Sequence, residues 1–551
     1  MRTAKALSLA FIVLVLISGA IVSAQPSIVW HKCLGGSNKD EAYSIQQISD
    51  GGFIVVGLTR SNDGDVSGYH GGQDFWIVKL SSSGNIIGQK CLGGSRDDLA
   101  YFVQQTTYGF IVVGYTNSND GDVSGNHGGW DFWVVKLNSF GDIVWQKCLG
   151  GSHDDVAYSI QQTSDGGFIV AGVTKSNDGD VSGNLGDRDF WIVKLNSSGD
   201  IVWQKCLGGS GYDVATSIQQ TSDGGFIVTG VTKSNDGDVS AHHGSTFYSD
   251  YWVVKLNSFG DIVWHKCLGG SRGDIPYPIQ QTSDGGFIVA GIAMSNNVDV
   301  SGNHGNSDFW VVKLDSSGRI DWQKCYGGSD LDDAYSIQQT SDGGFIVAGA
   351  TWSNDDDVSG NHGNYDYWVV KLNSAGNIEW QKCFGGSDRD IAYSIQQTSD
   401  GGFIVAGMTE SNNGDVSGKH GSWDYWVVKL DSSGDIVWQK CLGGSNRDGA
   451  LSIQQTSDGG FIVAGMTESN DGDVSGNHGR MDYWVVKLDS SGDIVWQKCL
   501  GGSNGDVALS IQQMSDGGFI VAGGTSSNDG DVSGNYGNSD FWVVKLSSEF
   551  K

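Results

Sequence analysis

The sequence predicts an all-β fold, a β-propeller built from nine tandem four-stranded blades of about 58 residues each. Three observations predict it. The nine cysteines recur 57 to 61 residues apart in a repeated unit that fills nearly the whole chain, and such a period is typical of propellers and solenoids. Each unit holds four strand-like runs separated by turn residues. No run shows helical periodicity, and the 551 residues include only 3 prolines.

The seventh repeat shows how the four strands of a unit are predicted. Residues 394–398 (SIQQT) are followed by Ser-Asp-Gly-Gly, a tight hairpin signal. Residues 403–407 (FIVAG) are continuously apolar, as expected of a strand buried on both faces. Residues 424–430 (DYWVVKL) are rich in aromatic and β-branched residues and lead into a turn, and residues 436–444 close the unit. Four antiparallel strands per unit are typical of a propeller blade.

The two ends of the array predict how the ring closes. After the leader the chain begins with a strand of the fourth type, Ile28–Gly35, and it ends with a strand of the third type, Asp540–Leu546. We expect the first strand to complete the last blade, which removes the exposed strand edges at the join. Common propellers have about four to eight blades, so an open superhelix or a ring with leftover repeats is the alternative. The propeller domain is predicted to span residues 27–546.

Residues 1–24 have the anatomy of a secretory signal peptide. Arg2 and Lys5 precede an apolar run, and Val22-Ser23-Ala24 forms a small-residue cleavage site. A retained membrane anchor is the alternative, but the apolar run is short for a span. We expect cleavage after Ala24, a secreted protein that is extracellular or on the cell surface, and no membrane insertion after cleavage.

The chain is strongly acidic, with a formal net charge of −30 that comes almost wholly from aspartate. Such a charge repels nucleic acid and anionic membranes and favours cations or cationic partners, so we expect no nucleic-acid partner. One cysteine per repeat places each thiol in a different blade, beyond the Cα separation of about 7 Å that a disulfide allows. We therefore expect buried free thiols that pack as small hydrophobic residues.

Two motifs carry a resemblance to a known family. Residues 399–407 (SDGGFIVAG) and 424–430 (DYWVVKL), with their copies throughout residues 27–546, resemble the secreted prokaryotic DGGF-type propeller-repeat proteins. The resemblance implies an extracellular propeller that binds or scaffolds, in a class whose function is largely unassigned. Related repeats are sometimes labelled lectin-like or glucanase-like.

Strand alternation places two loops of every blade on one face, the longer SNDGDVSGNHGxxD and the shorter GGSxxD. In the longer loop, carboxylates at i and i+2 with a glycine between them, followed by a later aspartate, suit a hard cation. The loop resembles the calcium loops of integrin-type propellers, although the third closely spaced acid of that pattern is missing. Two explanations stay open: calcium as a cofactor, or plain turn chemistry in which Asn and Asp bond their own backbone.

The candidate calcium ligands, blade by blade, are Asp63, Asp65 and Asp74; Asp120, Asp122 and Asp131; Asp178, Asp180 and Asp189; Asp236, Asp238 and Asp250; Asp299 and Asp308; Asp357 and Asp366; Asp415 and Asp424; Asp471, Asp473 and Asp482; Asp529, Asp531 and Asp540.

An enzyme needs one unique constellation of residues, whereas this chain supplies nine near-copies of each motif. No Ser-His-Asp pattern, phosphate loop or cofactor fingerprint emerges. We therefore expect a non-catalytic binding or scaffold protein that contacts an extracellular glycan or protein, for adhesion. The alternative is a propeller-type polysaccharide-degrading hydrolase of the glucanase kind. Its site would use residues that break the repeat: Glu41, Arg60, Glu379, Glu410, Glu468 or the Arg319–Asp321 segment.

Three further features bear on binding. Trp130, Trp352 and Trp423 lie in predicted loops and are candidates for stacking on sugars. A histidine recurs in the loop motif NHG, but one histidine per loop is poor spacing for zinc. Residues 272–274 spell the adhesive tripeptide Arg-Gly-Asp, but they fall in the GGSxxD position, where chance explains them.

Overall fold

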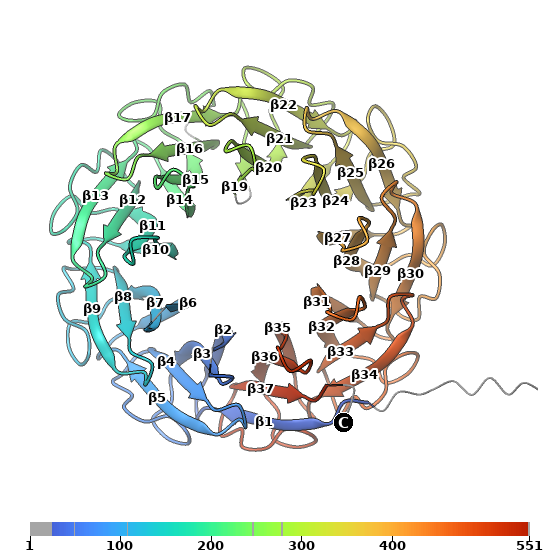
Figure 1. Cartoon of the computed structure of the whole chain (residues 1–551), viewed down its shortest axis with the longest axis horizontal. Helices are drawn as coiled ribbons and strands as arrows, with labels where there is room; N and C mark the ends of the chain where they lie inside the picture. Colours follow the sequence, from blue (N-terminus) through green and yellow to red (C-terminus); the bar gives the residue numbers. More distant parts are fainter. Residues whose placement is uncertain (1–24, 49, 107, 245–246, 277–278, 549–551) are drawn as a thin grey trace, which may run out of the picture.

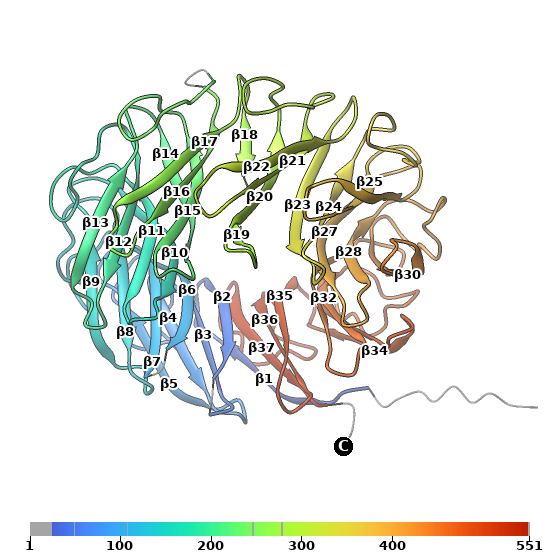
Figure 2. The same ribbon diagram turned by 45° about the horizontal axis from the view of Figure 1, so that its top comes forward.

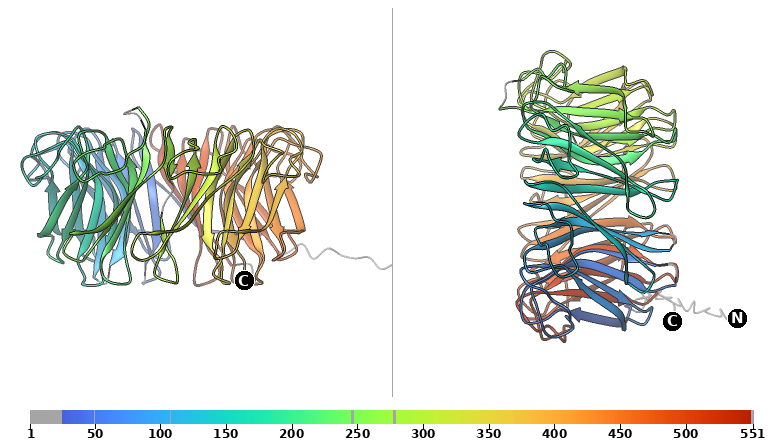
Figure 3. Two further views of the ribbon diagram at one scale, coloured as in Figure 1. Left: turned by 90° about the horizontal axis from the view of Figure 1, so that it is seen from above. Right: turned by 90° about the vertical axis from the view of Figure 1, so that its left-hand side faces the viewer.

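A computed structural model describes residues 25–548 except 49, 107, 245–246 and 277–278. The chain forms a closed ring of nine antiparallel sheets arranged in sequence order (Figure 1). The inner strands of neighbouring blades stand side by side around the centre of the ring (Figure 2). The strands run between two faces that carry the loops and turns (Figure 3). The predicted signal peptide, residues 1–24, lies outside the described residues.

The blades follow one plan, in which the strand that comes first in each blade is innermost. Blade 1 contains β2 (Asp40–Gln47), β3 (Phe53–Thr59), β4 (Asp74–Leu80) and β5 (Ile86–Leu92). Blade 2 contains β6 (Asp98–Thr106), β7 (Gly109–Thr116), β8 (Asp131–Leu137) and β9 (Ile143–Leu149). Blade 3 contains β10 (Asp155–Gln162), β11 (Phe168–Thr174), β12 (Asp189–Leu195) and β13 (Ile201–Leu207). Blade 4 contains β14 (Asp213–Gln220), β15 (Phe226–Thr232), β16 (Asp250–Leu256) and β17 (Ile262–Leu268).

In blade 5 the inner strand is described in two pieces, β18 (Asp274–Pro276) and β19 (Gln280–Gln281), followed by β20 (Phe287–Ala293), β21 (Asp308–Leu314) and β22 (Ile320–Tyr326). Blade 6 contains β23 (Asp332–Gln339), β24 (Phe345–Thr351), β25 (Asp366–Leu372) and β26 (Ile378–Phe384). Blade 7 contains β27 (Asp390–Gln397), β28 (Phe403–Thr409), β29 (Asp424–Leu430) and β30 (Ile436–Leu442). Blade 8 contains β31 (Asp448–Gln455), β32 (Phe461–Thr467), β33 (Asp482–Leu488) and β34 (Ile494–Leu500). Blade 9 contains β35 (Asp506–Gln513), β36 (Phe519–Thr525), β37 (Asp540–Leu546) and β1 (Ile28–Leu34).

The ring closes through its first strand, as predicted. Strand β1 pairs antiparallel with β37, with Cys33 opposite Trp542, so the blue N-terminal strand lies against the red C-terminal one in Figure 1. At the join, the Asp40 N–H donates to the Ser539 carbonyl oxygen at 2.6 Å. The nine-blade closed ring is confirmed, and the open superhelix is wrong.

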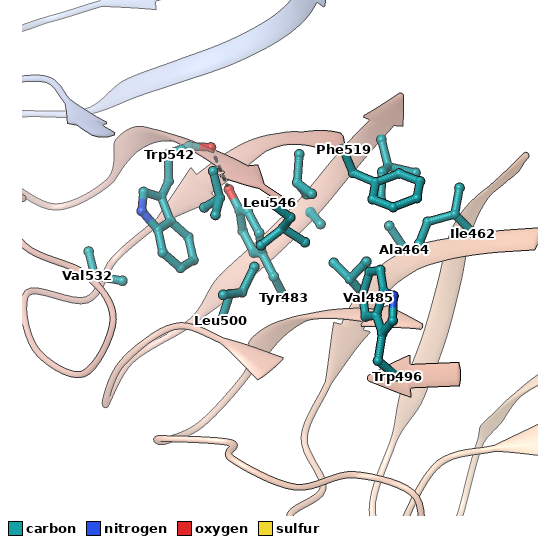
Figure 4. Packing of buried hydrophobic residues seen from close by; sticks show 14 of the residues in the cluster. Ile462, Ala464, Tyr483, Val485, Trp496, Leu500, Phe519, Val532, Trp542 and Leu546 are labelled. Carbon is teal, nitrogen blue, oxygen red and sulfur yellow. Dashed lines mark hydrogen bonds between the residues drawn. The ribbon is translucent and has the colours of Figure 1, made fainter. Parts of the chain in front are cut away.

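Aromatic pairs form the core between blades. In each third strand a phenylalanine or tyrosine packs against the fully buried tryptophan of the next blade, with ring centroids 4.3–4.7 Å apart. The ninth pair, Phe541 with Trp76, closes the circle. Figure 4 shows this packing between blades 8 and 9, where the Tyr483 hydroxyl donates to the Trp542 carbonyl oxygen at 3.1 Å. Such contacts add specific ring geometry to simple burial of apolar area.

The predicted turns and thiols are confirmed. In blade 3 the Ser-Asp-Gly-Gly turn closes with a hydrogen bond from the Thr163 N–H to the Gly167 carbonyl oxygen at 2.9 Å. Gly166 has φ of 81°, which favours glycine. Asp165 in this turn lies 2.9 Å from the Lys194 ammonium of the third strand. All nine cysteines are buried free thiols, and burial raises their pKa.

Candidate functional site

Two loops of every blade lie on one face of the ring, which we call the loop face. In blade 1 they are residues 60–73, between β3 and β4, and residues 93–97, which lead from β5 into blade 2. Antiparallel pairing brings these ends together, because Asp40 lies opposite Thr59 and Thr59 lies opposite Asp74. The opposite face carries the short hairpin turns. The predicted sorting of the loops is confirmed.

The first aspartate of each inner strand is a buried structural residue, a role that sequence reasoning missed. Asp98 accepts hydrogen bonds from the Thr116 hydroxyl, from the Ser118 hydroxyl at 2.9 Å and from the Gly94 N–H at 2.8 Å. Burial raises the pKa of Asp98 to about 6, because removal from water disfavours the charged form. The equivalent residues, all fully buried, are Asp40, Asp155, Asp213, Asp274, Asp332, Asp390, Asp448 and Asp506.

The aspartate that opens each third strand is also fully buried, and one of its oxygens faces a second acid. The Asp74 Oδ2 atom accepts the His70 N–H at 2.8 Å and lies 3.0 Å from His70 Nδ1. In eight of the nine blades the Oδ1 atom has no hydrogen-bond partner among the described residues. A Cβ atom on Gly93 would lie 2.6 Å from Asp74 Oδ1 and 2.7 Å from Asp98 Oδ2. Each blade interface therefore holds a buried acid pair, Asp74 with Asp98 in the first.

These acid pairs have strongly raised pKa values. Burial raises the pKa of Asp74 to about 7, and the neighbouring Asp98 carboxylate adds to the rise. The pKa of Asp189 and that of Asp540 are likewise raised to about 7 by burial and by the facing acid. Two carboxylates that share a dry site hold a proton more readily than they hold two negative charges.

The three predicted calcium ligands of one loop have three different partners. Asp120 Oδ1 accepts the Ser95 N–H at 2.7 Å, whereas Asp122 Oδ2 lies 3.7 Å from His70 Nε2 of the preceding blade. Asp131, the third ligand, is buried in an acid pair. Within the described part of the chain, no group of three or more His, Cys, Asp or Glu side chains could hold a metal ion. Calcium binding stays a prediction, and these contacts supply a structural explanation for the same aspartates.

The recurring histidine joins neighbouring blades. His70 lies between Asp74 of its own blade and Asp122 of the next. The same bridge, with distances of 2.8–3.9 Å, is made by His127, His362, His420 and His478, and His243 bridges Asp250 and Asp299 at 3.6 and 3.7 Å. The signal in the sequence is the four-residue spacing between the histidine and the buried aspartate, except in blade 4, where His243 precedes Asp250 by seven residues.

Residues that differ from repeat to repeat gather on the inner half of the loop face, which we call the inner rim. Its six positions per blade come from the start of the inner strand, the end of the second strand and the residue before the third. Isolated bridges between neighbouring blades, such as Trp423 with Arg447, hold these segments side by side. In blade 7 the positions carry Arg389, Ile391, Tyr393, Met408, Glu410 and Trp423; in blade 1 Lys39, Glu41, Tyr43, Leu58, Arg60 and Gln73; and in blade 9 Gly505, Val507, Leu509, Gly524, Ser526 and Ser539.

Exposure alone does not explain this variation. The outer strands also present an exposed position, occupied by Val29, Val144, Val202, Val263 and Val437, each 52–58% exposed. Six of the nine repeats keep valine there. At the inner rim, by contrast, the same position changes from tryptophan to serine, glutamine, arginine or methionine between blades.

Part of the inner rim is a continuous run of aromatic rings, which we call the aromatic ladder. Ring centroids are 6.2 Å apart between Tyr43 and Tyr101, 5.3 Å between Tyr101 and Tyr115, and 4.6 Å between Tyr115 and Trp130. The Tyr101 and Tyr115 hydroxyls are hydrogen-bonded at 2.8 Å. Tyr43 and Tyr101 remain 40% and 42% exposed, so part of each side chain is open to solvent.

A second aromatic group lies on the rim of blades 6 to 8. Trp352 and Tyr365 have ring centroids 5.4 Å apart, and the Arg447 guanidinium lies 4.2 Å from the centre of the Trp423 ring. Tyr365 and Trp423 pack on a small apolar floor that includes Met408. The three loop tryptophans predicted to stack on sugars therefore all belong to the inner rim, and their sugar stacking stays a prediction.

The residues suggested for a hydrolase are scattered. Glu41, Glu410 and Glu468 lie on the inner rim of three different blades. Glu379 lies on an outer strand, 3.1 Å from the Lys371 ammonium, and Asp321 lies on another outer strand.

The Arg-Gly-Asp tripeptide does not present its acid. Asp274 is fully buried and accepts hydrogen bonds from the Ser295 hydroxyl and the Gly270 N–H, both at 2.9 Å.

Comparisons with known proteins do not assign the chain to a family. No family model matches it. A segment of 164 residues, 28% of this chain, is 29% identical to the regulatory protein FlaEY of Caulobacter vibrioides and covers 17% of that protein. The chain thus spans far less than two thirds of the length of this relative. No helix in the described residues is long and apolar enough to cross a membrane.

Solved structures with a similar chain path are distant in sequence. One is a eukaryotic initiation factor, with 9% identity, a TM-score of 0.45, and 86% of this chain and 91% of that chain covered. Another is the biofilm matrix protein Bap1 of V. cholerae, with 11% identity, a TM-score of 0.26 and coverage of 95% and 91%. A puromycin hydrolase has 10% identity, a TM-score of 0.36 and coverage of 80% and 60%. At these values the likenesses carry no argument about function.

Proposed function

We propose that this chain is an exported, non-catalytic binding propeller that contacts an extracellular glycan or protein through its inner rim. The observation that carries the proposal is the concentration of repeat-to-repeat differences at that rim, within blades that otherwise stay nearly alike. Duplicated repeats begin identical, and the equally exposed valines of the outer wall have largely remained so. Differences concentrated on one surface support selection for contact there.

The chemistry of the rim supports recognition. Tyrosine and tryptophan offer large, rigid, amphipathic faces, and aromatic residues and arginine are enriched where proteins bind partners. Here they alternate with serine, glutamate and lysine, which donate and accept hydrogen bonds. The framework beneath is rigid, because aromatic pairs, buried acids and histidine bridges join each blade to the next.

The placement of the acids supports a non-catalytic role. Glycoside hydrolysis uses two carboxyl groups about 5–9.5 Å apart that a sugar can reach. The buried acid pairs are inaccessible to a polymer. On the rim, the Glu41 carboxylate is already engaged by the Lys39 ammonium at 2.6 Å and by the Tyr43 hydroxyl at 2.9 Å.

Export rests on the leader at residues 1–24 and on the resemblance to secreted DGGF-type repeats.

A printed array of extracellular polysaccharides and matrix proteins tests the proposal. We expect purified residues 25–551 to bind at least one printed ligand. A combined rim variant (Tyr101→Leu, Trp130→Ser, Trp352→Ser, Tyr393→Leu, Trp423→Ser) should lose that binding. A wall variant (Val144→Thr, Val202→Thr, Val263→Thr) should keep it. Binding that survives the rim changes would contradict the proposal. Release of reducing sugars from a soluble β-glucan, abolished by Glu410→Gln or Glu468→Gln, would establish the hydrolase instead.

A further inference from the structure

The rim of blade 9 is hollowed where other blades are filled. At four rim positions blade 7 carries Arg389, Met408, Glu410 and Trp423, whereas blade 9 carries Gly505, Gly524, Ser526 and Ser539. The small residues leave a cleft of about 260 Å³ between blades 9 and 1. Its walls also include Val507, Leu509, Glu41 and Tyr43. The lining residues come mostly from β2, β35 and the segments next to them, and these two strands are neighbours across the join in Figure 1.

The two glycines provide space rather than backbone freedom. A Cβ atom on Gly505 would meet nothing within 4 Å, and one on Gly524 would meet only the Ser539 hydroxyl oxygen, at 3.5 Å. Neither glycine has a positive φ. The backbone would therefore accept larger residues here, as it does at the same positions of blades 7 and 8. Their small size is what opens the cleft.

The cleft carries no net charge. Glu41 is its one charged lining residue, and the Lys39 ammonium neutralises that carboxylate at 2.6 Å. Among the described residues, neither the Ser526 nor the Ser539 hydroxyl has a hydrogen-bond partner, so both remain available to a ligand. This local neutrality, in a chain of net charge −30, favours an uncharged ligand with hydroxyl groups.

Apolar surface lies beside these hydroxyls. Leu509 is 52% exposed, and Tyr43 is held in place because its hydroxyl donates to Glu41 at 2.9 Å. An amphipathic ring can place its C–H face on Tyr43 while its hydroxyl groups reach the serines. Tyr43 is also the first ring of the aromatic ladder, which continues through Tyr101 and Tyr115 to Trp130.

We propose that the cleft and the aromatic ladder together form one site for a neutral polysaccharide chain. One sugar occupies the cleft against Tyr43, and the following sugars lie along the ladder over the rims of blades 1 and 2. This inference rests on the proposed binding function and names its ligand class and position. A charged polymer fits less well, because a polyanion meets the acidic loop face and a polycation has no unpaired carboxylate in the cleft.

The site is tested with substitutions that introduce residues already present at the equivalent positions of other blades. Gly524→Met with Ser539→Trp installs what blade 7 carries and fills the cleft. Gly449→Val, which installs the residue of Val507 one blade away, is the matched control. Tyr101→Leu and Trp130→Ser interrupt the ladder with residues found at the same positions of blade 9. Val144→Thr, on the outer strand β9 of the same blade as Tyr101, is their control.

Affinity gel electrophoresis of residues 25–551 supplies the readout, with β-1,3-glucan, glucomannan, xyloglucan and hydroxyethylcellulose as neutral probes. Polygalacturonate and chitosan are the charged comparators. We expect retardation by at least one neutral polymer, weakened about tenfold or more by the filled cleft and about threefold or more by each ladder change. The two controls should stay within about twofold of the unmodified chain. Circular dichroism and thermal unfolding verify that every variant is folded.

Neutral-polymer binding that the filled cleft leaves unchanged would overturn this inference and leave the binding function intact. Retardation by the charged polymers alone, or by none of the six, would also overturn it. A ligand found on the printed array that depends on the rim, such as a matrix protein, would then still support the broader function. If neither assay finds a ligand whose binding depends on the inner rim, both this inference and the proposed binding function are rejected.

Discussion

Replacing one member of a buried acid pair, Asp74→Asn, tests whether ionisation of these pairs limits the stability of the ring. In the folded chain the pKa of Asp74 is raised to about 7, against about 3.9 in an unfolded chain. The folded state therefore holds the proton more tightly, and stability falls as pH rises from about 4 to about 7. About three pKa units, at about 1.4 kcal/mol each, correspond to a loss of about 4 kcal/mol for this residue.

The variant preserves the contacts of the aspartate. An asparagine carbonyl oxygen can accept from the His70 N–H as Oδ2 does at 2.8 Å, while its amide faces Asp98 and can donate to it. Because asparagine does not ionise, we expect the variant to be more stable than the unmodified chain at about pH 8, by up to about 4 kcal/mol. At about pH 4 the advantage should vanish.

Urea unfolding followed by tryptophan fluorescence, at about pH 4, 6 and 8, measures the difference. Asp187→Asn removes an exposed acid of the loop face and is the control for net charge. A stability difference between Asp74→Asn and the unmodified chain that is constant with pH would refute the reasoning. An equal pH dependence for Asp187→Asn would assign the effect to net charge rather than to the buried pair.

Three further outcomes follow from the same contacts. Gly93→Ala should lower the free energy of unfolding by about 3 kcal/mol or more, because its Cβ would lie within 2.7 Å of two carboxylate oxygens. Gly505→Ala, whose Cβ meets nothing within 4 Å, is the control and should change stability little. Equal losses in the two variants would contradict the steric explanation. A chain that begins at residue 36 lacks β1 and exposes the edge of β37, so light scattering should detect self-association. A stable monomer would show that closure of the ring by β1 is dispensable. In millimolar calcium the melting temperature should be less than about 2 °C higher than in EDTA, because the loop aspartates already have partners. A rise of many degrees, absent with magnesium, would instead establish the calcium sites suggested by the sequence.

The architecture could be predicted from the amino-acid sequence. A strict repeat with four β-runs specifies the blade, because alternation and turn residues act locally. Closure of the ring could also be predicted. Ile28–Leu34 is a strand of the fourth type without a blade of its own, and the blade that ends with Asp540–Leu546 lacks a fourth strand. One cysteine per repeat sufficed to predict free buried thiols.

The roles of the acids and the position of the candidate site could be found only in the folded chain. Asp120, Asp122 and Asp131 are close in sequence, which made a shared cation plausible, but in the fold each contacts a different segment. The acid pairs join separate blades across one glycine. The cleft likewise assembles residues from both ends of the chain, including Glu41 and Ser539. Sequence patterns report neighbours along the chain, whereas closing the ring sets which distant side chains share one dry pocket or one open surface.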